Sequence, residues 1–200
     1  VVGVAGFANL TGNFEVKLNT GEESFAADFT VSEEPVSLDL PEGPYLRIAG
    51  EDVSVDVSIG ADTQTISGDF AFEEHGTGDN RQVVLGLNNV ATTIEAGPLS
   101  VEASEGMGAF LLQSTGVAGV ATVGEVNLIG VPGVSLNVVD LAIRVNNTGG
   151  DVNDGEADPG PITIDVGGET IAFEFTGPAE HQHLSVAGSA ELVITDFVNL

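Results

Sequence analysis

The chain has 200 residues, of which 42% are hydrophobic, and a formal net charge of −27 from 31 acidic and four basic residues. This apolar fraction excludes a disordered chain and is enough for one large domain or two smaller ones. The negative charge makes nucleic acid and anionic membranes poor partners, whereas cations are compatible with it. The absence of cysteine excludes disulfides, thiolate metal sites and a cysteine nucleophile.

The first residue is valine and the last segment ends in apolar alternation, so we expect a piece of a longer protein or a processed chain. No apolar run approaches 18 residues, and we therefore expect no membrane insertion.

Apolar and polar residues alternate along most of the chain. The segments with this pattern are 36–40, 53–59, 69–73, 134–138, 162–166 and 171–175. Alternation places apolar side chains on one face of a strand and polar ones on the other. Helix-favouring residues are scarce, and glycine, valine, threonine and phenylalanine are abundant. The sequence therefore predicts an all-β fold.

A short motif interrupts the alternation: a small residue, an acid or asparagine, and then an apolar residue. It occurs at 12–14, 27–29, 68–70, 124–126 and 139–141. Glycines at 50, 68, 86, 106 and 124 follow one another every 18 to 20 residues. Glycine inside a strand marks a bulge, a bend or a close backbone approach. We therefore expect a corner that recurs in each structural unit.

A longer repeat is visible in "FEVKLNTG" at 14–21, which returns as "LAIRVNNTG" at 141–149. "VSEEPVSLDL" at 31–40 likewise matches "VGGETIAFEF" at 166–175, and 45–50 matches 183–188. The offsets increase along the chain, as they do when a second copy carries insertions. We interpret residues 1–115 as one repeat unit and 116–200 as a second, diverged and incomplete one.

The repeat also predicts side-chain orientation. We expect Phe14, Val16 and Leu18 to point inward. Lys17 and Arg144 occupy matched positions, and the repeat interpretation fails if they point into the core instead.

The phrases "LNTG" at 18–21, "LDLPEGPYLRIAG" at 38–50 and "ISGDFAFEE" at 66–74 resemble a repeat of very large, acidic, secreted bacterial proteins. The resemblance covers most of the first unit and is poorer in the second, where "LPEGPY" has become "FTGPAEHQH". It implies a tandem array in a giant secreted or surface protein, often beside calcium-binding repeats. It assigns no catalytic residue.

The densest set of oxygen ligands lies in "DVNDGEADPG" at 151–160. It comprises Asp151, Asn153, Asp154, Glu156 and Asp158. Calcium takes six to eight oxygens, and an acidic loop with alternating carboxylates supplies several. The bidentate glutamate of an EF-hand is missing. A solvated turn is the alternative, because Asp, Asn, Gly and Pro are also turn residues.

Other candidate sites are weaker. A second acidic turn at 73–80 offers Glu73, Glu74, Asp79 and Asn80, but it simply joins two strands. His181 and His183 fall on one face of a strand without a third soft ligand. No nucleophile motif accompanies a histidine, and paired carboxylates are unspecific among 31 acids. We therefore predict no catalysis.

These patterns predict an elongated, repeat-built β structure with β-solenoid-like stacked strands; two tandem β-sandwich domains are the alternative. The predicted function is a structural spacer of an extracellular or cell-surface protein, such as an adhesin stalk or filament, and its partners are further copies of the repeat and divalent cations. The alternative function is a binding module for carbohydrate or another surface ligand.

Overall fold

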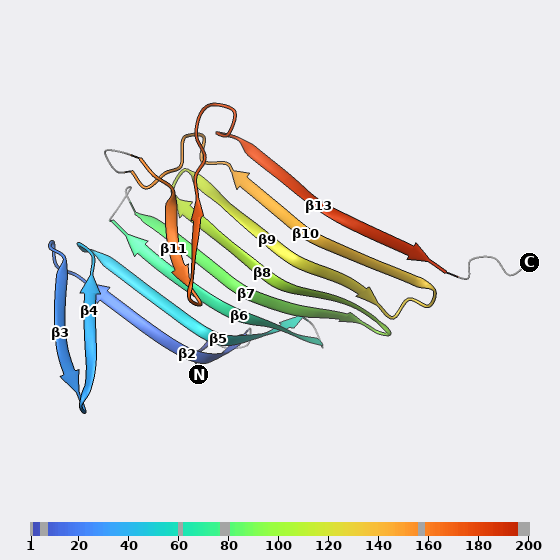
Figure 1. Ribbon diagram of the computed structural model, residues 1–200, viewed down its shortest axis with the longest axis horizontal. Coiled ribbons are helices and arrows are strands. Elements are labelled where there is room, and N and C mark those ends of the chain that lie inside the picture. The colour runs from blue at the N-terminus through green and yellow to red at the C-terminus, as the bar shows by residue number, and fades with distance from the viewer. Residues whose placement is uncertain (1, 5–7, 60–61, 77–80, 156–158, 196–200) are drawn as a thin grey trace, which may run out of the picture.

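The computed structural model describes residues 2–4, 8–59, 62–76, 81–155 and 159–195, and its main element is a nine-stranded antiparallel sheet (Figure 1). The strands lie in the order β1, β2, β5, β6, β7, β8, β9, β10 and β13. Their bounds are β1 (Val2–Val4), β2 (Ala8–Asn19), β5 (Tyr45–Ile59), β6 (Asp62–His75), β7 (Gln82–Ala96), β8 (Leu99–Gln113), β9 (Gly116–Ile129), β10 (Val134–Asn146) and β13 (His183–Ile194). The all-β prediction is confirmed. The described residues form open antiparallel sheets, and the solenoid-like rod and the two sandwich domains both stay predictions.

A line of bulges crosses the sheet from β2 to β10. The strand register shifts at Thr11/Asn13, Gly50/Val53, Ser67/Asp69, Leu87/Val90 and Val139/Ala142. Asp52, Asn89, Glu105 and Asp140 have positive φ at this line. A bulge adds an unpaired residue and bends its strand. Four of the five small–acid–apolar motifs lie here, whereas 27–29 lies in a regular strand.

Two hairpins branch from the main sheet. β3 (Phe25–Val31) and β4 (Glu34–Leu40) form one between β2 and β5 in the chain. β11 (Ile162–Val166) and β12 (Glu169–Phe173) form the other between β10 and β13. Both turn through two residues of positive φ, Ser32–Glu33 and Gly167–Gly168, which is the geometry of tight antiparallel hairpins. The order of strand, side hairpin and strand therefore occurs twice. The division between 115 and 116 stays a prediction.

The core lies between the hairpin β11–β12 and one face of the sheet, which we call the covered face. The hairpin and the segments beside it contribute the large buried side chains. They are Val152, Ile162, Ile164, Val166, Ile171, Phe173 and Phe175. The sheet contributes Val84 and Leu111 together with small residues, Ala71, Ala109 and Ala118. A Cβ at Gly86 would meet Ile164 at 3.0 Å and Val166 at 3.2 Å, so this position admits no larger residue without displacement. Small residues thus let the hairpin approach the strands.

The orientation predicted for the first strand is wrong. Phe14, Val16 and Leu18 are exposed. They share the face opposite the hairpin, which we call the open face, with the residues paired to them across the sheet. Lys17 and Arg144 lie on the covered face, but their side chains stay 31% and 41% exposed, so neither points into the core. The alternation therefore correctly grouped these three side chains on one face of β2, but the second layer of the core covers the other face.

The two hairpins provide a matched pair for testing this core. Ile164 and Phe29 occupy the same hairpin position, but Ile164 is buried and Phe29 is exposed. We expect Ile164→Ala to lower the free energy of unfolding by about 2–4 kcal/mol because it opens a cavity. Phe29→Ala should cost less than about 1 kcal/mol. Urea denaturation of both variants measures the difference, and equal losses would contradict the assignment of the core.

Candidate functional site

The predicted calcium loop is an excursion from the strand that leads into β11. Val152 pairs with Phe175 through backbone hydrogen bonds of 2.8 and 2.9 Å, and the chain returns to the hairpin at Ile162. In the first hairpin, Phe25 pairs with Leu40 and β3 continues without interruption. The acidic segment is therefore an insertion within a strand that the first unit keeps whole.

Hydrogen bonds within the chain engage the predicted ligands that the structure describes. Asp151 Oδ1 accepts the Gly177 amide at 2.8 Å and lies 2.7 Å from His181 Nε2. The hydrogen bond with His181 has the largest effect, and together with that from Gly177 it lowers the pKa of Asp151 below its ordinary value. Asn153 Oδ1 accepts the amide of Gly155 at 3.0 Å, as in an Asx turn.

The base of the loop is closed by Asp154. Its amide donates to the Gly160 carbonyl at 3.0 Å, and its Oδ1 accepts the Gly160 amide at 3.1 Å. Glu156 and Asp158 lie outside the described residues. Within the described part of the chain, no group of three or more His, Asp or Glu side chains is placed to hold a metal ion. The calcium site stays a prediction.

Calorimetry tests the calcium prediction directly. If 151–158 binds calcium, titration of the metal-free chain should release heat and raise the melting temperature. Asp154→Asn should abolish both effects, because it removes a charge but keeps an oxygen that can accept the Gly160 amide. Asp39→Asn, in β4, is the control for general loss of charge and should leave both unchanged. If the wild-type chain shows neither heat nor a higher melting temperature, the loop is only a turn and the calcium prediction is wrong.

The other predicted ligands are dispersed. His183 Nε2 lies 3.0 Å from Ser185 Oγ, whereas His181 contacts Asp151. Glu74 pairs with Arg81 through two hydrogen bonds of 2.7 Å, and Glu73 pairs with Arg47. Asp79 and Asn80 lie outside the described residues. The structure therefore brings neither the two histidines nor Glu73 and Glu74 onto one common ligand position.

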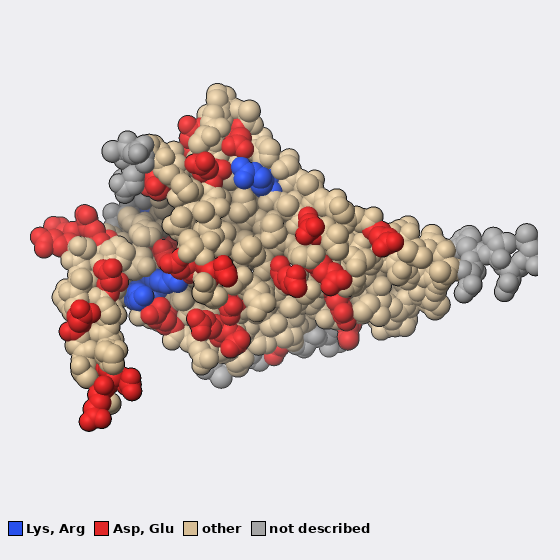
Figure 2. Space-filling view, viewed as in Figure 1, with Lys and Arg blue, Asp and Glu red and all other residues tan. Residues whose placement is uncertain are grey.

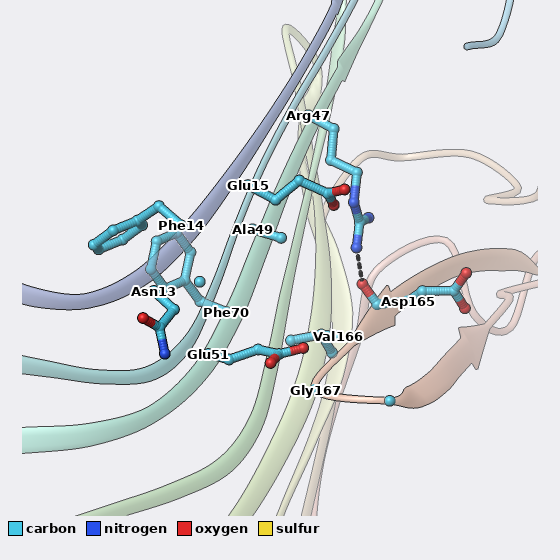
Figure 3. A pocket seen from close by; sticks show the side chains of 12 residues that line it. Asn13, Phe14, Glu15, Arg47, Ala49, Glu51, Phe70, Asp165, Val166 and Gly167 are labelled. Carbon is cyan, nitrogen blue, oxygen red and sulfur yellow. Dashed lines mark hydrogen bonds between the residues drawn. The ribbon is translucent and has the colours of Figure 1, made fainter. Parts of the chain in front are cut away.

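A groove of about 370 Å³ opens where the tip of β11–β12 meets β2 and β5 (Figure 3). Arg47 crosses it and donates from Nη2 to the Asp165 carbonyl at 2.5 Å, while its Nη1 pairs with Glu73. Glu15 and Glu51 lie on the same side of the strands as Arg47. Phe14 and Phe70 also line the groove, with their rings on the opposite side of the strands (Figure 3).

The pKa values of two groups beside Arg47 are shifted. Burial raises the pKa of Glu73, but the hydrogen bond with His75 and the charge of Arg47 outweigh it and lower the pKa below the ordinary value. Burial and the Glu73 charge raise the pKa of Tyr45 to about 12, so the phenol stays neutral. Arg47 therefore has a charged partner in the sheet and a carbonyl partner in the hairpin tip, and it holds the tip in place.

The repeated asparagine forms a clamp at the base of each hairpin. Asn146 Nδ2 donates to the carbonyls of Gly150 at 3.0 Å and Glu180 at 2.8 Å. Asn19 Nδ2 donates in the same way to Glu23 at 2.8 Å and Pro41 at 2.7 Å. The side-chain oxygens accept amides two residues ahead, those of Thr148 and Gly21. Each asparagine thus joins the chain entering its hairpin to the chain leaving it.

This clamp is a role that sequence analysis missed. The signal was present, because Asn19 and Asn146 are part of the echo between 14–21 and 141–149. The basic position of the same echo, two residues before the asparagine, has a related role in the second unit. Arg144, which matches Lys17, lies 4.6 Å over the Phe175 ring and donates to the Glu174 carbonyl at 3.2 Å. The most conspicuous repeat of the sequence therefore encodes the attachment of the side hairpins.

The two asparagines make a second matched pair. Asn146 is 1% exposed, whereas Asn19 is only half-buried and water can replace its partners. We expect Asn146→Ala to cost about 2–3 kcal/mol, since it removes a buried side chain and leaves two half-buried carbonyls without their donor. Asn19→Ala should cost about 1 kcal/mol or less. Denaturant unfolding of the two variants checks this, and the clamp assignment fails if Asn146→Ala is as mild as Asn19→Ala.

The surface differs sharply between the two faces of the sheet. Figure 2 shows acidic side chains over the face that bears β11–β12 and along the hairpin β3–β4. The open face instead presents large apolar side chains, among them Val16, Leu18, Ile94, Leu184 and Val186. Contiguous exposed apolar patches mark interaction sites, ligand-binding grooves or aggregation liabilities.

In comparisons with protein-family models, curated proteins and solved structures, nothing matches the chain. Among the described residues, no helix is long and apolar enough to cross a membrane.

Proposed function

We propose that the chain is a structural, non-catalytic segment of a large secreted or cell-surface protein, in which successive copies extend one antiparallel sheet. The observation that carries the proposal is the twofold occurrence of a strand, a side hairpin and a strand within a single sheet. β2 and β10 begin this arrangement, and β5 and β13 end it.

The edges of the sheet support the proposal. β10 pairs with β9 on one side and with β13 on the other over most of its length. Residues 11–19 of β2, in the part of the chain that the structure describes, pair only with β5. Unpaired strand edges are templates for another strand. A strand placed against β2 as β9 lies against β10 would continue the sheet.

The geometry sets the size of each addition. One copy contributes β2 and β5 to β9, six strands of the main sheet. At a spacing of about 4.8 Å, six strands lengthen the sheet by about 29 Å. An array built this way grows across its strands and is elongated, as the sequence patterns predict. The acidic residues keep neighbouring arrays apart at low ionic strength, and salt or divalent cations screen them.

A fusion of residues 1–129 to residues 3–200 tests the proposal. Residues 3–6, "GVAG", would then follow Ile129 in place of 130–133, "GVPG", which precede β10. We expect small-angle scattering to fit a sheet that is about 29 Å wider across its strands than that of the single chain. The fusion should also unfold in one cooperative transition. Two independently moving copies would contradict the spacer and favour the alternative, a compact module that binds carbohydrate or another surface ligand.

A further inference from the structure

The hairpin β3–β4 has an apolar face with no counterpart to cover it in the described structure. Val31, Phe29 and Val36 are 52%, 47% and 37% exposed. Their equivalents in β11–β12 are Val166, Ile164 and Ile171, which are 2%, 2% and 7% exposed. Figure 1 shows the reason: β11–β12 lies over the sheet, whereas β3–β4 projects from its edge.

The two hairpins are otherwise built alike. Val31 pairs with Glu34 and Phe29 with Val36, as Val166 pairs with Glu169 and Ile164 with Ile171. The turns have the same two positive φ angles, and equivalent asparagines clamp the bases. The two hairpins therefore differ in burial because different strands lie next to β2 and β10, from which they emerge.

β11–β12 follows β10 and folds back over strands that precede β10 in the sheet. β11 contacts β6 and β7, and β12 contacts β8. Beyond β2, the described structure offers the corresponding hairpin only the short β1. β11–β12 occupies a row of small residues on the covered face, which we call the lane. It consists of Ala71, Gly86 and Ala109, and Arg47 lies at its far end. An equivalent lane would come within reach of β3–β4 if another copy continued the sheet past β2.

We propose that β3–β4 docks on the covered face of a preceding copy of this chain, over the strands that correspond to β6, β7 and β8. This inference rests on the proposed function, because the preceding copy must first extend the sheet. It makes each copy both a donor and a receiver: β11–β12 on β6–β8 is the one complete example within this chain. The exposed apolar face of β3–β4 is then a docking surface for a second copy, and the interface is continuous with the packing already present.

The tip of the hairpin is the point of tightest fit. A Cβ at Gly167 would collide with Asp69 and approach Asn88 at 2.9 Å, and the equivalent residue of β3–β4 is Ser32. In a fusion built from this chain alone, Ser32→Gly in the second copy removes that collision. The acidic residues beside the turn, Glu33 and Glu34, would reach the region of Arg47 in the preceding copy.

Thiol labelling of the 1–129/3–200 fusion tests the docking, because the chain has no cysteine of its own. The fusion carries Ser32→Gly in its second copy, and Val31→Cys in either copy. We expect the thiol in the second copy to react with a maleimide at least about 10-fold more slowly than the same thiol in the first copy, whose hairpin has no copy before it. Thr30→Cys, on the other face of the second hairpin, should react at the rate of an exposed thiol.

A stability measurement gives an independent readout. Phe29→Asp in the second copy should lower the melting temperature of the fusion, because docking would bury the carboxylate. The same change in the first copy, or in the single chain, should have little effect. Equal labelling rates in the two copies, or equal melting temperatures, would overturn the docking. If the scattering still shows a lengthened sheet, only the docking fails; if the copies move independently, the spacer function fails as well.

Discussion

The packing of β11–β12 on the sheet is the interaction on which the rest of the structure depends. A single sheet cannot bury apolar side chains without a second layer, and in the described residues the hairpin is the second layer of the core. The large side chains come mainly from the hairpin, and the sheet contributes the small residues Ala71, Gly86, Ala109 and Ala118. The Arg47 hydrogen bond at the tip and the Asn146 clamp at the base then fix both ends of the hairpin.

Much of this fold could be predicted from the sequence, because strands and bulges are local features. Alternation at 134–138 and 162–166 correctly indicated strands, and that at 171–175 matches a strand as far as Phe173. Glycines at 68, 106 and 124 lie at the line of bulges. Gly86 does not lie at a bulge. It marks a close approach instead, since Ile164 packs against it. Both outcomes follow from the missing side chain.

What could not be predicted was the choice of face. Phe14, Val16 and Leu18 alternate with charged residues in their strand, so the pattern indicated that their side is the core. The second layer instead covers alanines and glycines, whose importance depends on a hairpin more than 40 residues away in the chain. The candidate metal loop was hard to judge for a related reason. Asp151, Asn153 and Asp154 suit a turn and a cation equally, and only their partners distinguish the two uses.

The line of bulges has a consequence for how an array of such sheets would assemble. Neighbouring strands of similar length and pattern can pair with the wrong partner or slip along one another, and repeat proteins misfold in this way. Asp52, Asn89, Glu105 and Asp140 each adopt positive φ at one point of their strand, and these points line up across the sheet. A slip of two residues keeps the apolar side chains on their face, but it sets an irregular backbone against a regular one and forfeits hydrogen bonds. The bulges therefore act as a register mark that lets a strand recognise its correct neighbour.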